Sequence, residues 1–447
     1  MKFRVLSLLL CLILVLSLCG CNFAKNVSEE ILGGDSDTSV TQEVIDTEKY
    51  DMIDKSLVDF RTSLYTGVSL NKGYESLKSE EQKKCYEGIA KNVMYVSKEP
   101  SDASYPIAPV TLNNIELSEA QLHLVISAYT MDHPQIFWIE SKFSYYTQDG
   151  VTFLQLNSGM SADEIRDTAK QMSEKIEEIF DEIDGDLTPY ERELAIHDAF
   201  ASRCEYADLD AAGTDDFRVY TSVGGLVDNN AVCEGYSRSM QILLSMAGIE
   251  TYYVFGTGNE GLHMWNVVNL DGVWSHLDVT WNDNESGIRY NHFNLTEEEI
   301  TQDHTLSPFF WELTEEEICG GTSGLAESFN IFVPECSDDD SSYYAKNSIA
   351  VMNFDEATLE KIAQALISSL DRGEEVIYLY LDPASLVYDN AIDKLFEDED
   401  KPLIFDCIEK ANNQIYYTQI DDSSVEIAEI PERNIVCVYF SQVEYYY

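Results

Sequence analysis

Three residues of the sequence could form a catalytic set: Cys233, His263 and Asp278. In such a set a thiolate attacks a carbonyl carbon, an imidazole carries the proton, and a carboxylate orients the imidazole. Alone, a cysteine is by default a small buried hydrophobe, and a histidine is by default a packing or surface residue. The case for chemistry therefore depends on the elements that would bring these three residues together.

Cys233 is predicted to lie at the start of a helix. Apolar residues recur after it with the spacing of a helix that has one apolar face, and Gly248 ends the pattern; they are Met240, Leu243, Leu244 and Ala247. The unpaired N–H groups and the positive end of the helix dipole favour a thiolate there. They can also donate to an oxyanion that forms beside the sulfur. This position suits a nucleophile.

A predicted hairpin brings His263 and Asp278 together. After a strand at 251–255 and a polar loop at 256–261, two strands at 264–270 and 273–280 flank Asp271-Gly272, a strong hairpin signal. A two-residue turn pairs Leu270 with Val273 and, counting outward, His263 with Thr280. Because side chains alternate between faces, His263 and Asp278 become diagonal neighbours on one face, within reach of each other.

His276 is an alternative partner for the carboxylate. It lies two residues before Asp278 and therefore on the same face of the predicted strand. The spacing alone leaves both histidines open.

The segment resembles the transglutaminase-like superfamily, especially its bacterial secreted members. The resemblance lies in Cys233-Glu234-Gly235-Tyr236, Leu243-Leu244, Gly248-Ile249, His263-Met264-Trp265-Asn266, Asp271-Gly272 and Asp278-Val279-Thr280-Trp281-Asn282-Asp283. It implies a papain-like fold in which Cys233 is the nucleophile, His263 the base and Asp278 its orienter. It thereby selects His263 over His276.

Three aromatic residues near this set are assigned to substrate binding: Tyr236, Trp265 and Trp281. Each also has a plain packing explanation, with Tyr236 beneath the nucleophile and the tryptophans in the core or the cleft wall. We expect neither a metal nor another cofactor.

Two predicted helices lead into the segment, at 161–183 and at 189–204, where Thr188 is the N-cap and Pro189 the first helical residue. With them the resemblance covers about 160–305. It extends weakly to residues that resemble the tail of the family: Tyr290, Phe293, Asn294, Asp303 and His304.

The fold class is predicted to be α+β, with a transglutaminase-like domain at 159–325 between accessory α/β domains at 46–158 and 326–447. The first accessory domain shows helical patterns at 49–65, 76–97 and 117–132, and then strands at 136–139, 143–146 and 151–156. The second shows a strand at 349–352, a helix at 355–370, and strands at 376–380 and 434–440. His123 and His133 are expected to be structural.

The N-terminus predicts export. A basic start and the apolar run 5–18 indicate a signal peptide over 1–20, and Leu18-Cys19-Gly20-Cys21 resembles a lipobox in which Cys21 receives the lipid. The polar segment 21–45 indicates an acidic tether. We therefore expect a lipoprotein on the outer face of a bacterial membrane; an uncleaved anchor or plain secretion is the alternative.

Composition restricts the partners. The chain has 81 acidic and 28 basic residues, a formal net charge of −53, which disfavours nucleic acid and anionic polymers. Ten cysteines without a C-x-x-C pair argue against a zinc site and leave room for a free thiol. The acidic loop 208–216 suggests calcium, but Ala212 and Val219 stand where an EF-hand loop needs oxygen ligands, which favours a solvated loop.

These features predict a surface-anchored thiol enzyme that cleaves or transfers peptide or carboxamide acyl groups, with hydrolysis favoured over transamidation. Its substrate would be a peptide, a protein or a cell-wall peptide. The alternative is a non-catalytic surface binding or assembly protein on the same scaffold, because the two flanking regions together outweigh the central one.

Overall fold

The computed structural model describes residues 45–183, 185–209, 216–258, 261–284, 287–306, 332–338, 341–398, 401–415 and 418–444. The predicted signal peptide, Cys21, nearly all of the tether and the centre of the acidic loop 208–216 lie outside these residues. The chain forms two compact units, which divide between residues 339 and 340.

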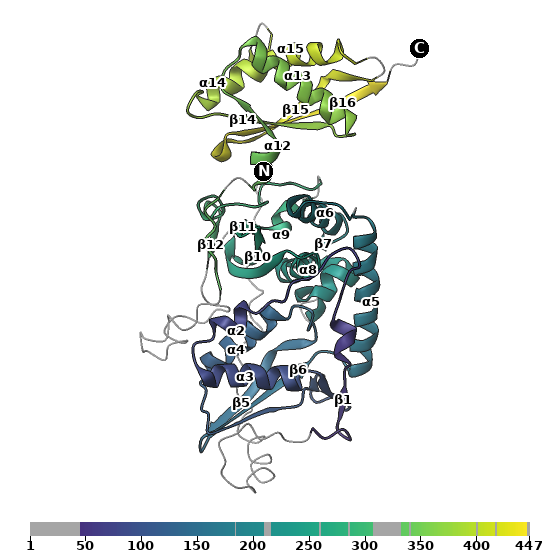
Figure 1. Ribbon diagram of the computed structural model, residues 1–447, viewed down its shortest axis with the longest axis vertical. Helices are drawn as coiled ribbons and strands as arrows, with labels where there is room; N and C mark the ends of the chain where they lie inside the picture. The colour runs from purple at the N-terminus through teal and green to yellow at the C-terminus, as the bar shows by residue number, and fades with distance from the viewer. Residues whose placement is uncertain are drawn as a thin grey trace. The chain divides into compact units, whose positions relative to one another are not determined.

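A four-stranded antiparallel sheet forms the centre of the first unit. Its order is β11-β10-β9-β12, with β9 at Glu250–Gly258, β10 at Gly261–Leu270, β11 at Val273–Leu277 and β12 at His304–Leu306. The helix α8, Cys233–Met246, packs on β9 and β10 (Figure 1). It buries Met240, Leu243 and Leu244, so the predicted apolar face is confirmed.

The predicted hairpin register is confirmed from Leu270–Val273 out to Asn266–Leu277. Asp271 and Gly272 both have positive φ, 54° and 94°, as a two-residue turn of this kind requires. The prediction that the second strand continues to Thr280 is wrong. The strand ends at Leu277 because Asp278 accepts a hydrogen bond from the Trp281 N–H and starts α9, Val279–Asn282.

The predicted loop at 256–261 is also wrong in extent. β9 continues to Gly258 and β10 begins at Gly261, so His263 pairs with Gly256 on one side. On the other side the expected pairing of His263 with Thr280 does not form, because β11 ends at Leu277. Gly256 has a packing reason: a Cβ there would lie 1.8 Å from the Thr305 carbonyl oxygen of β12. This glycine permits the close approach of a third strand and is no turn signal.

The helices before the catalytic segment form as predicted. They are α5, Ala162–Asp181, and α6, Pro189–Ala201. Each begins with a capping box, which Ser161 and Glu164 form in α5 and Thr188 and Glu191 form in α6. α5 runs along one side of the unit, where it contacts η1 and α6 (Figure 1). The chain then passes β7 (Glu205–Tyr206), η2 (Phe217–Tyr220), η3 (Gly224–Asp228) and β8 (Asn230–Ala231). β8 pairs with β7 directly before Cys233, and α10 (Glu297–Ile300) precedes β12.

The N-terminal part of the first unit differs from its prediction in two helices. It contains β1 (Tyr50–Met52), η1 (Lys55–Val58), α2 (Lys72–Ser76), α3 (Glu80–Asn92), β2 (Tyr95–Ser97), β3 (Tyr105–Pro106), β4 (Val110–Asn113), α4 (Glu119–Asp132), β5 (Ile139–Gln148) and β6 (Val151–Ser158). The predicted helix at 49–65 is wrong: β1 and η1 lie there, and β1 pairs with β2. The predicted helix at 76–97 is confirmed as α3 but is shorter, because its C-terminal end, Tyr95–Ser97, is the strand β2. The helix at 117–132 is confirmed as α4. The strands predicted at 136–139 and 143–146 form a single strand, β5, which begins only at Ile139.

Buried polar contacts join this N-terminal part to the central sheet. The Tyr252 hydroxyl of β9 accepts hydrogen bonds from the N–H groups of Asn71 and Lys72. The Gln241 side chain of α8 donates to the Met131 carbonyl and accepts from the Tyr253 N–H. The described residues of 46–158 therefore pack with the central residues in one unit.

The second unit has its own sheet and core. Its elements are α12 (Tyr343–Asn347), β13 (Ser348–Val351), α13 (Glu356–Asp371), β14 (Val376–Leu381), α14 (Tyr388–Ile392), η5 (Asp393–Glu397), α15 (Leu403–Asn412), β15 (Thr418–Ile430), η6 (Pro431–Arg433) and β16 (Ile435–Glu444). The strand order is β13-β14-β16-β15, and α13 and α15 pack on the sheet. The predicted strand-helix-strand pattern is confirmed. Among the described residues, no helix combines the length and the apolar composition that a membrane crossing needs.

A prediction concerns Gly235 in the first turn of α8. A Cβ there would lie 2.6 Å from the Val219 carbonyl oxygen and 2.7 Å from the Ala231 Cβ. Because these contacts involve rigid backbone, Gly235→Ala should lower the free energy of unfolding by about 1–3 kcal/mol in urea denaturation. Gly261→Ala is the control, because a Cβ there would lie 3.7 Å from the Gly258 carbonyl oxygen, an ordinary contact distance. Equal effects of the two substitutions would contradict the packing argument.

Candidate active site

Cys233 is the first residue of α8, and its side chain is partly exposed. The N-cap residue before it, Val232, has extended backbone and makes no side-chain hydrogen bond to the helix. The other five described cysteines are buried. Burial raises the pKa of Cys85, Cys204, Cys336 and Cys407 to about 12. Among the described thiols, Cys233 is therefore the accessible one.

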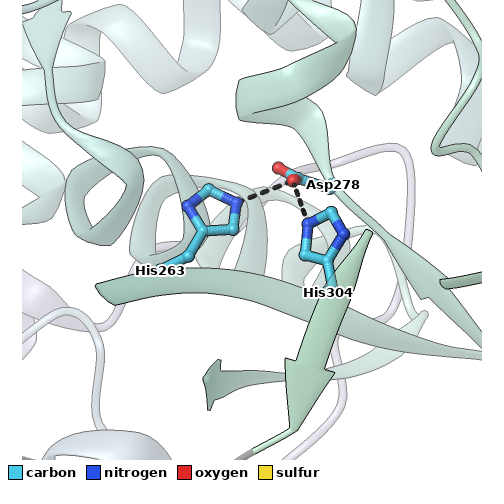
Figure 2. A group of neighbouring side chains, drawn as sticks. All are labelled: His263, Asp278 and His304. Carbon is cyan, nitrogen blue, oxygen red and sulfur yellow. Dashed lines mark hydrogen bonds and ion pairs between the residues drawn. The ribbon is translucent and has the colours of Figure 1, made fainter. Parts of the chain in front are cut away.

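His263 and Asp278 meet as the hairpin register predicts. The His263 Nε2 lies 2.7 Å from the Asp278 Oδ2 (Figure 2), and both residues are buried. The carboxylate therefore takes one ring nitrogen and leaves Nδ1 for the thiol. A side-chain hydrogen bond with Cys233 acts to raise the pKa of His263. The thiol and the imidazole are therefore next to each other. The structure thus brings all three predicted catalytic residues together.

The charges in this set reinforce one another. Burial acts to lower the pKa of His263, but the charge and hydrogen bond of Asp278 and the interaction with Cys233 outweigh it and raise that pKa to about 10. Burial acts to raise the pKa of Asp278, but His263 outweighs it, so the pKa of this carboxyl falls below its ordinary value. The arrangement stabilises an imidazolium beside the thiol, which is the partner that a thiolate needs.

His276, the alternative base, has a different role. Its Nδ1 accepts a hydrogen bond of 3.1 Å from the Trp265 indole N–H. Burial and the nearby His304 lower the pKa of His276 to about 3, so the ring is neutral. A buried neutral imidazole with its acceptor nitrogen occupied is a packing residue and not a base.

The aromatic residues assigned to substrate binding divide into two groups. Tyr236 and Trp265 are fully buried, so neither offers a surface to a substrate. The Tyr236 hydroxyl donates to the Asp283 Oδ2 at 2.5 Å, and Trp265 stacks on the His263 ring. Trp281 is partly exposed and packs against His263, with 5.5 Å between ring centroids. Of the three, Trp281 can contact a substrate.

Sequence reasoning missed a second histidine at the Asp278 carboxylate. The His304 Nε2 lies 3.1 Å from the same Asp278 Oδ2 that His263 contacts (Figure 2). Its Nδ1 lies 2.6 Å from the Asp303 Oδ1, and the Asp303 Oδ2 lies 2.9 Å from the His292 Nε2. The one signal in the sequence is the pair Asp303-His304, which resembles the tail of the transglutaminase-like family only weakly. Its place follows from the pairing of β12 with β9, 46 residues away at Gly258.

Tyr206 is another missed neighbour of the nucleophile. Desolvation of its hydroxyl and the charge of Cys233 raise the pKa of Tyr206, although the residue as a whole is 56% exposed. Its strand, β7, pairs with β8, which leads into α8. No local pattern in the sequence indicates that Tyr206 lies near the thiol.

Two groups of side chains have the atom types of metal ligands, within 4.8 Å of one another: His263, Asp278 and His304, and His292, Asp303 and His304. In each group the carboxylate is already hydrogen-bonded to both imidazoles. A metal would have to replace these bonds. The hydrogen bonds account for the geometry, and we identify none of these residues as a metal ligand.

Comparison with known proteins agrees with this geometry. The family model of the transglutaminase-like superfamily matches residues 162–279, which include Cys233, His263 and Asp278. Residues 162–279 form a transglutaminase-like domain. The rest of the chain lies outside the match, and no curated protein matches the chain.

Two solved structures share a partial likeness with the chain. One is described as a TGase, at 15% identity and a TM-score of 0.24, and covers 40% of this chain. The other is described as a "putative cysteine protease" from Cytophaga hutchinsonii, at 13% identity and a TM-score of 0.22, and covers 33%. The chain spans 53% and 64% of these two proteins. At such TM-scores neither likeness carries an argument.

The pairing of His263 predicts how stability depends on pH. The pKa of His263 is about 10 in the folded protein, against about 6.5 in an unfolded chain. The pairing therefore stabilises the fold fully below about pH 6.5, and this stabilisation is lost as the pH rises through about 10. The free energy of unfolding of the wild type, minus that of His263→Gln, should fall between these pH values by up to a few kcal/mol. A constant difference in urea denaturation would show that His263 is not held protonated.

Proposed function

We propose that the protein is a thiol acyl enzyme of the transglutaminase-like type. One observation carries the proposal: the accessible Cys233 stands at the start of α8 beside an imidazole that a buried carboxylate holds at 2.7 Å. Nucleophile, base and orienter are the three parts of a cysteine-based triad.

The geometry suggests a reaction in two steps. The Cys233 sulfur attacks the carbonyl carbon of a peptide or carboxamide while its proton resides on the His263 Nδ1. N–H groups in the first turn of α8 donate to the oxyanion that forms. The C–N bond then breaks, His263 gives its proton to the leaving amine, and a thioester remains on Cys233. Water or a second amine, deprotonated by His263, attacks the thioester and releases the thiol.

Hydrolysis is the favoured outcome, so we propose a peptidase or amidase before a transamidase. A strongly acidic chain, with a formal net charge of −53, favours a neutral or cationic peptide, protein or cell-wall peptide as the substrate. Trp281 beside His263 offers an apolar wall for such a substrate.

Labelling of the thiol tests the activated pair. With iodoacetamide near neutral pH, we expect rapid labelling at Cys233, none there in Cys233→Ala, and labelling slower by roughly tenfold or more in His263→Ala. The reason is that a cysteine with an ordinary pKa of about 8.5 is only a few per cent thiolate at pH 7. Cys204→Ala, which removes a buried thiol, should label as the wild type does. Equal rates in wild type and His263→Ala would refute an activated thiolate.

Turnover should be tested with the purified chain on peptide and amine-donor libraries. Cys233→Ala and Asp278→Asn are the matched inactive variants, because loss of a triad member costs about 10⁴-fold in rate or more. Release of ammonia or of a peptide fragment without amine incorporation indicates hydrolysis. Binding without turnover in the wild type would favour the non-catalytic alternative.

We further propose that the chain is anchored as a lipoprotein through Cys21. The support is the basic start, the apolar run 5–18 and the lipobox-like Leu18-Cys19-Gly20-Cys21. Two or more acyl chains would give stable anchoring without a transmembrane helix.

The anchoring proposal is tested by detergent-phase partitioning of the protein from expressing bacteria. Wild type and Cys19→Ser should partition into the detergent phase, whereas Cys21→Ser should not. The reverse result, with Cys19→Ser released and Cys21→Ser retained, would assign the lipid to Cys19 instead.

A further inference from the structure

His304 lies between two carboxylates in the first unit. Its Nε2 is 3.1 Å from the Asp278 Oδ2 and its Nδ1 is 2.6 Å from the Asp303 Oδ1. The ring is buried, with the Trp281 ring centroid 4.2 Å away and that of Trp265 at 4.9 Å. Both ring nitrogens of this histidine therefore face a carboxylate oxygen.

This geometry determines the protonation of His304. An ionised carboxylate only accepts hydrogen bonds, and a neutral imidazole carries one N–H and one lone pair. A neutral His304 would place its lone pair against one of the two carboxylates at hydrogen-bond distance. An imidazolium satisfies both contacts and balances the buried charge. Burial opposes that charge, but the bonds to Asp278 and Asp303 outweigh it and raise the pKa of His304.

We propose that His304 is a positioning residue of the active site, held as an imidazolium between Asp278 and Asp303. In this form His304 fixes the Asp278 side chain and weakens the attraction of that carboxylate for a proton on His263. This proposal rests on the proposed function, because it concerns the same thiol and imidazole.

The consequence for catalysis follows from the shared oxygen. His263 and His304 both contact the Asp278 Oδ2, and their ring centroids are 5.3 Å apart. A permanent positive charge at that distance opposes the imidazolium form of His263 and favours the thiolate form of Cys233. It therefore moves the pH range in which thiolate and imidazolium coexist toward lower pH. Without it, Asp278 would hold the proton on His263 more tightly and make it a poorer acid for the leaving amine.

The groups that face His304 come from several elements. Asp278 follows β11, His263 belongs to β10, Asp303 precedes β12, and His292 lies 5.4 Å from the His304 ring between centroids. His276 of β11 also interacts with His304 but is neutral, with its pKa lowered to about 3 by burial and by His304. Asp303, whose side chain is 40% exposed, also accepts from His292 at 2.9 Å.

The experiment measures the rate of alkylation of Cys233 by iodoacetamide against pH, using the full chain. In His304→Gln the amide can still donate to Asp278 but carries no charge. The midpoint of the rate increase should move upward by about one pH unit or more, because removal of a nearby positive charge raises the pKa of the thiol–imidazole pair. His276→Gln is the matched control: the same substitution, equally buried and close by, at a neutral ring. Its midpoint should stay at the wild-type pH.

The outcomes separate the two proposals. Failure of wild-type Cys233 to label selectively refutes the proposed function. Normal wild-type labelling with an unshifted His304→Gln midpoint, or with equal shifts in His304→Gln and His276→Gln, refutes the role of His304 alone. A wild-type midpoint that moves on addition of a chelator would also refute it, since a metal would then occupy the imidazole.

A second measurement applies if His304→Gln does not fold. ¹⁵N-histidine NMR of His263→Gln at pH 8 should show a ring with both nitrogens protonated. Absence of such a ring would overturn the proposal, because an ordinary histidine is neutral at that pH.

Discussion

The candidate active site depends on one buried carboxylate. Asp278 has no exposure, and a charge in that position is stable only when hydrogen bonds compensate it. Its Oδ2 contacts His263 of β10 and His304 of β12, and its Oδ1 accepts from the Trp281 N–H of α9. Two strands and a helix thus meet at a single side chain. The same contacts that satisfy the charge also fix the imidazole that faces Cys233.

The sequence predicted the local parts of this arrangement. Apolar spacing gave α8, and the Asp271-Gly272 turn gave a register that placed His263 and Asp278 on one face, since both signals act over a few residues. The family resemblance was needed to choose His263 over His276. The structure explains why His276 is not the base, because its Nδ1 accepts a hydrogen bond from Trp265. No local sequence pattern predicts this contact.

Non-local contacts account for what could not be predicted. His304 reaches Asp278 only because β12 pairs with β9 over a gap of dozens of residues, and Gly256, which permits this pairing, has the appearance of a loop residue. The predicted helix at 49–65 failed for a similar reason, because β1 pairs with β2. In both places tertiary pairing decided the structure against the local pattern.

Val232 gives the nucleophile helix an uncapped beginning. The helices α3, α4, α5 and α6 each begin with a serine or threonine whose side chain accepts a hydrogen bond from an N–H of the first turn. Val232 makes no such hydrogen bond to the first turn of α8. Serine or aspartate there would ordinarily stabilise a helix by about 1 kcal/mol. In the proposed reaction, a side-chain oxygen at this position would compete with the oxyanion for N–H groups in the first turn of α8. If the proposed reaction takes place here, the missing cap trades helix stability for catalysis, and selection for heat resistance alone would favour a capping residue at position 232.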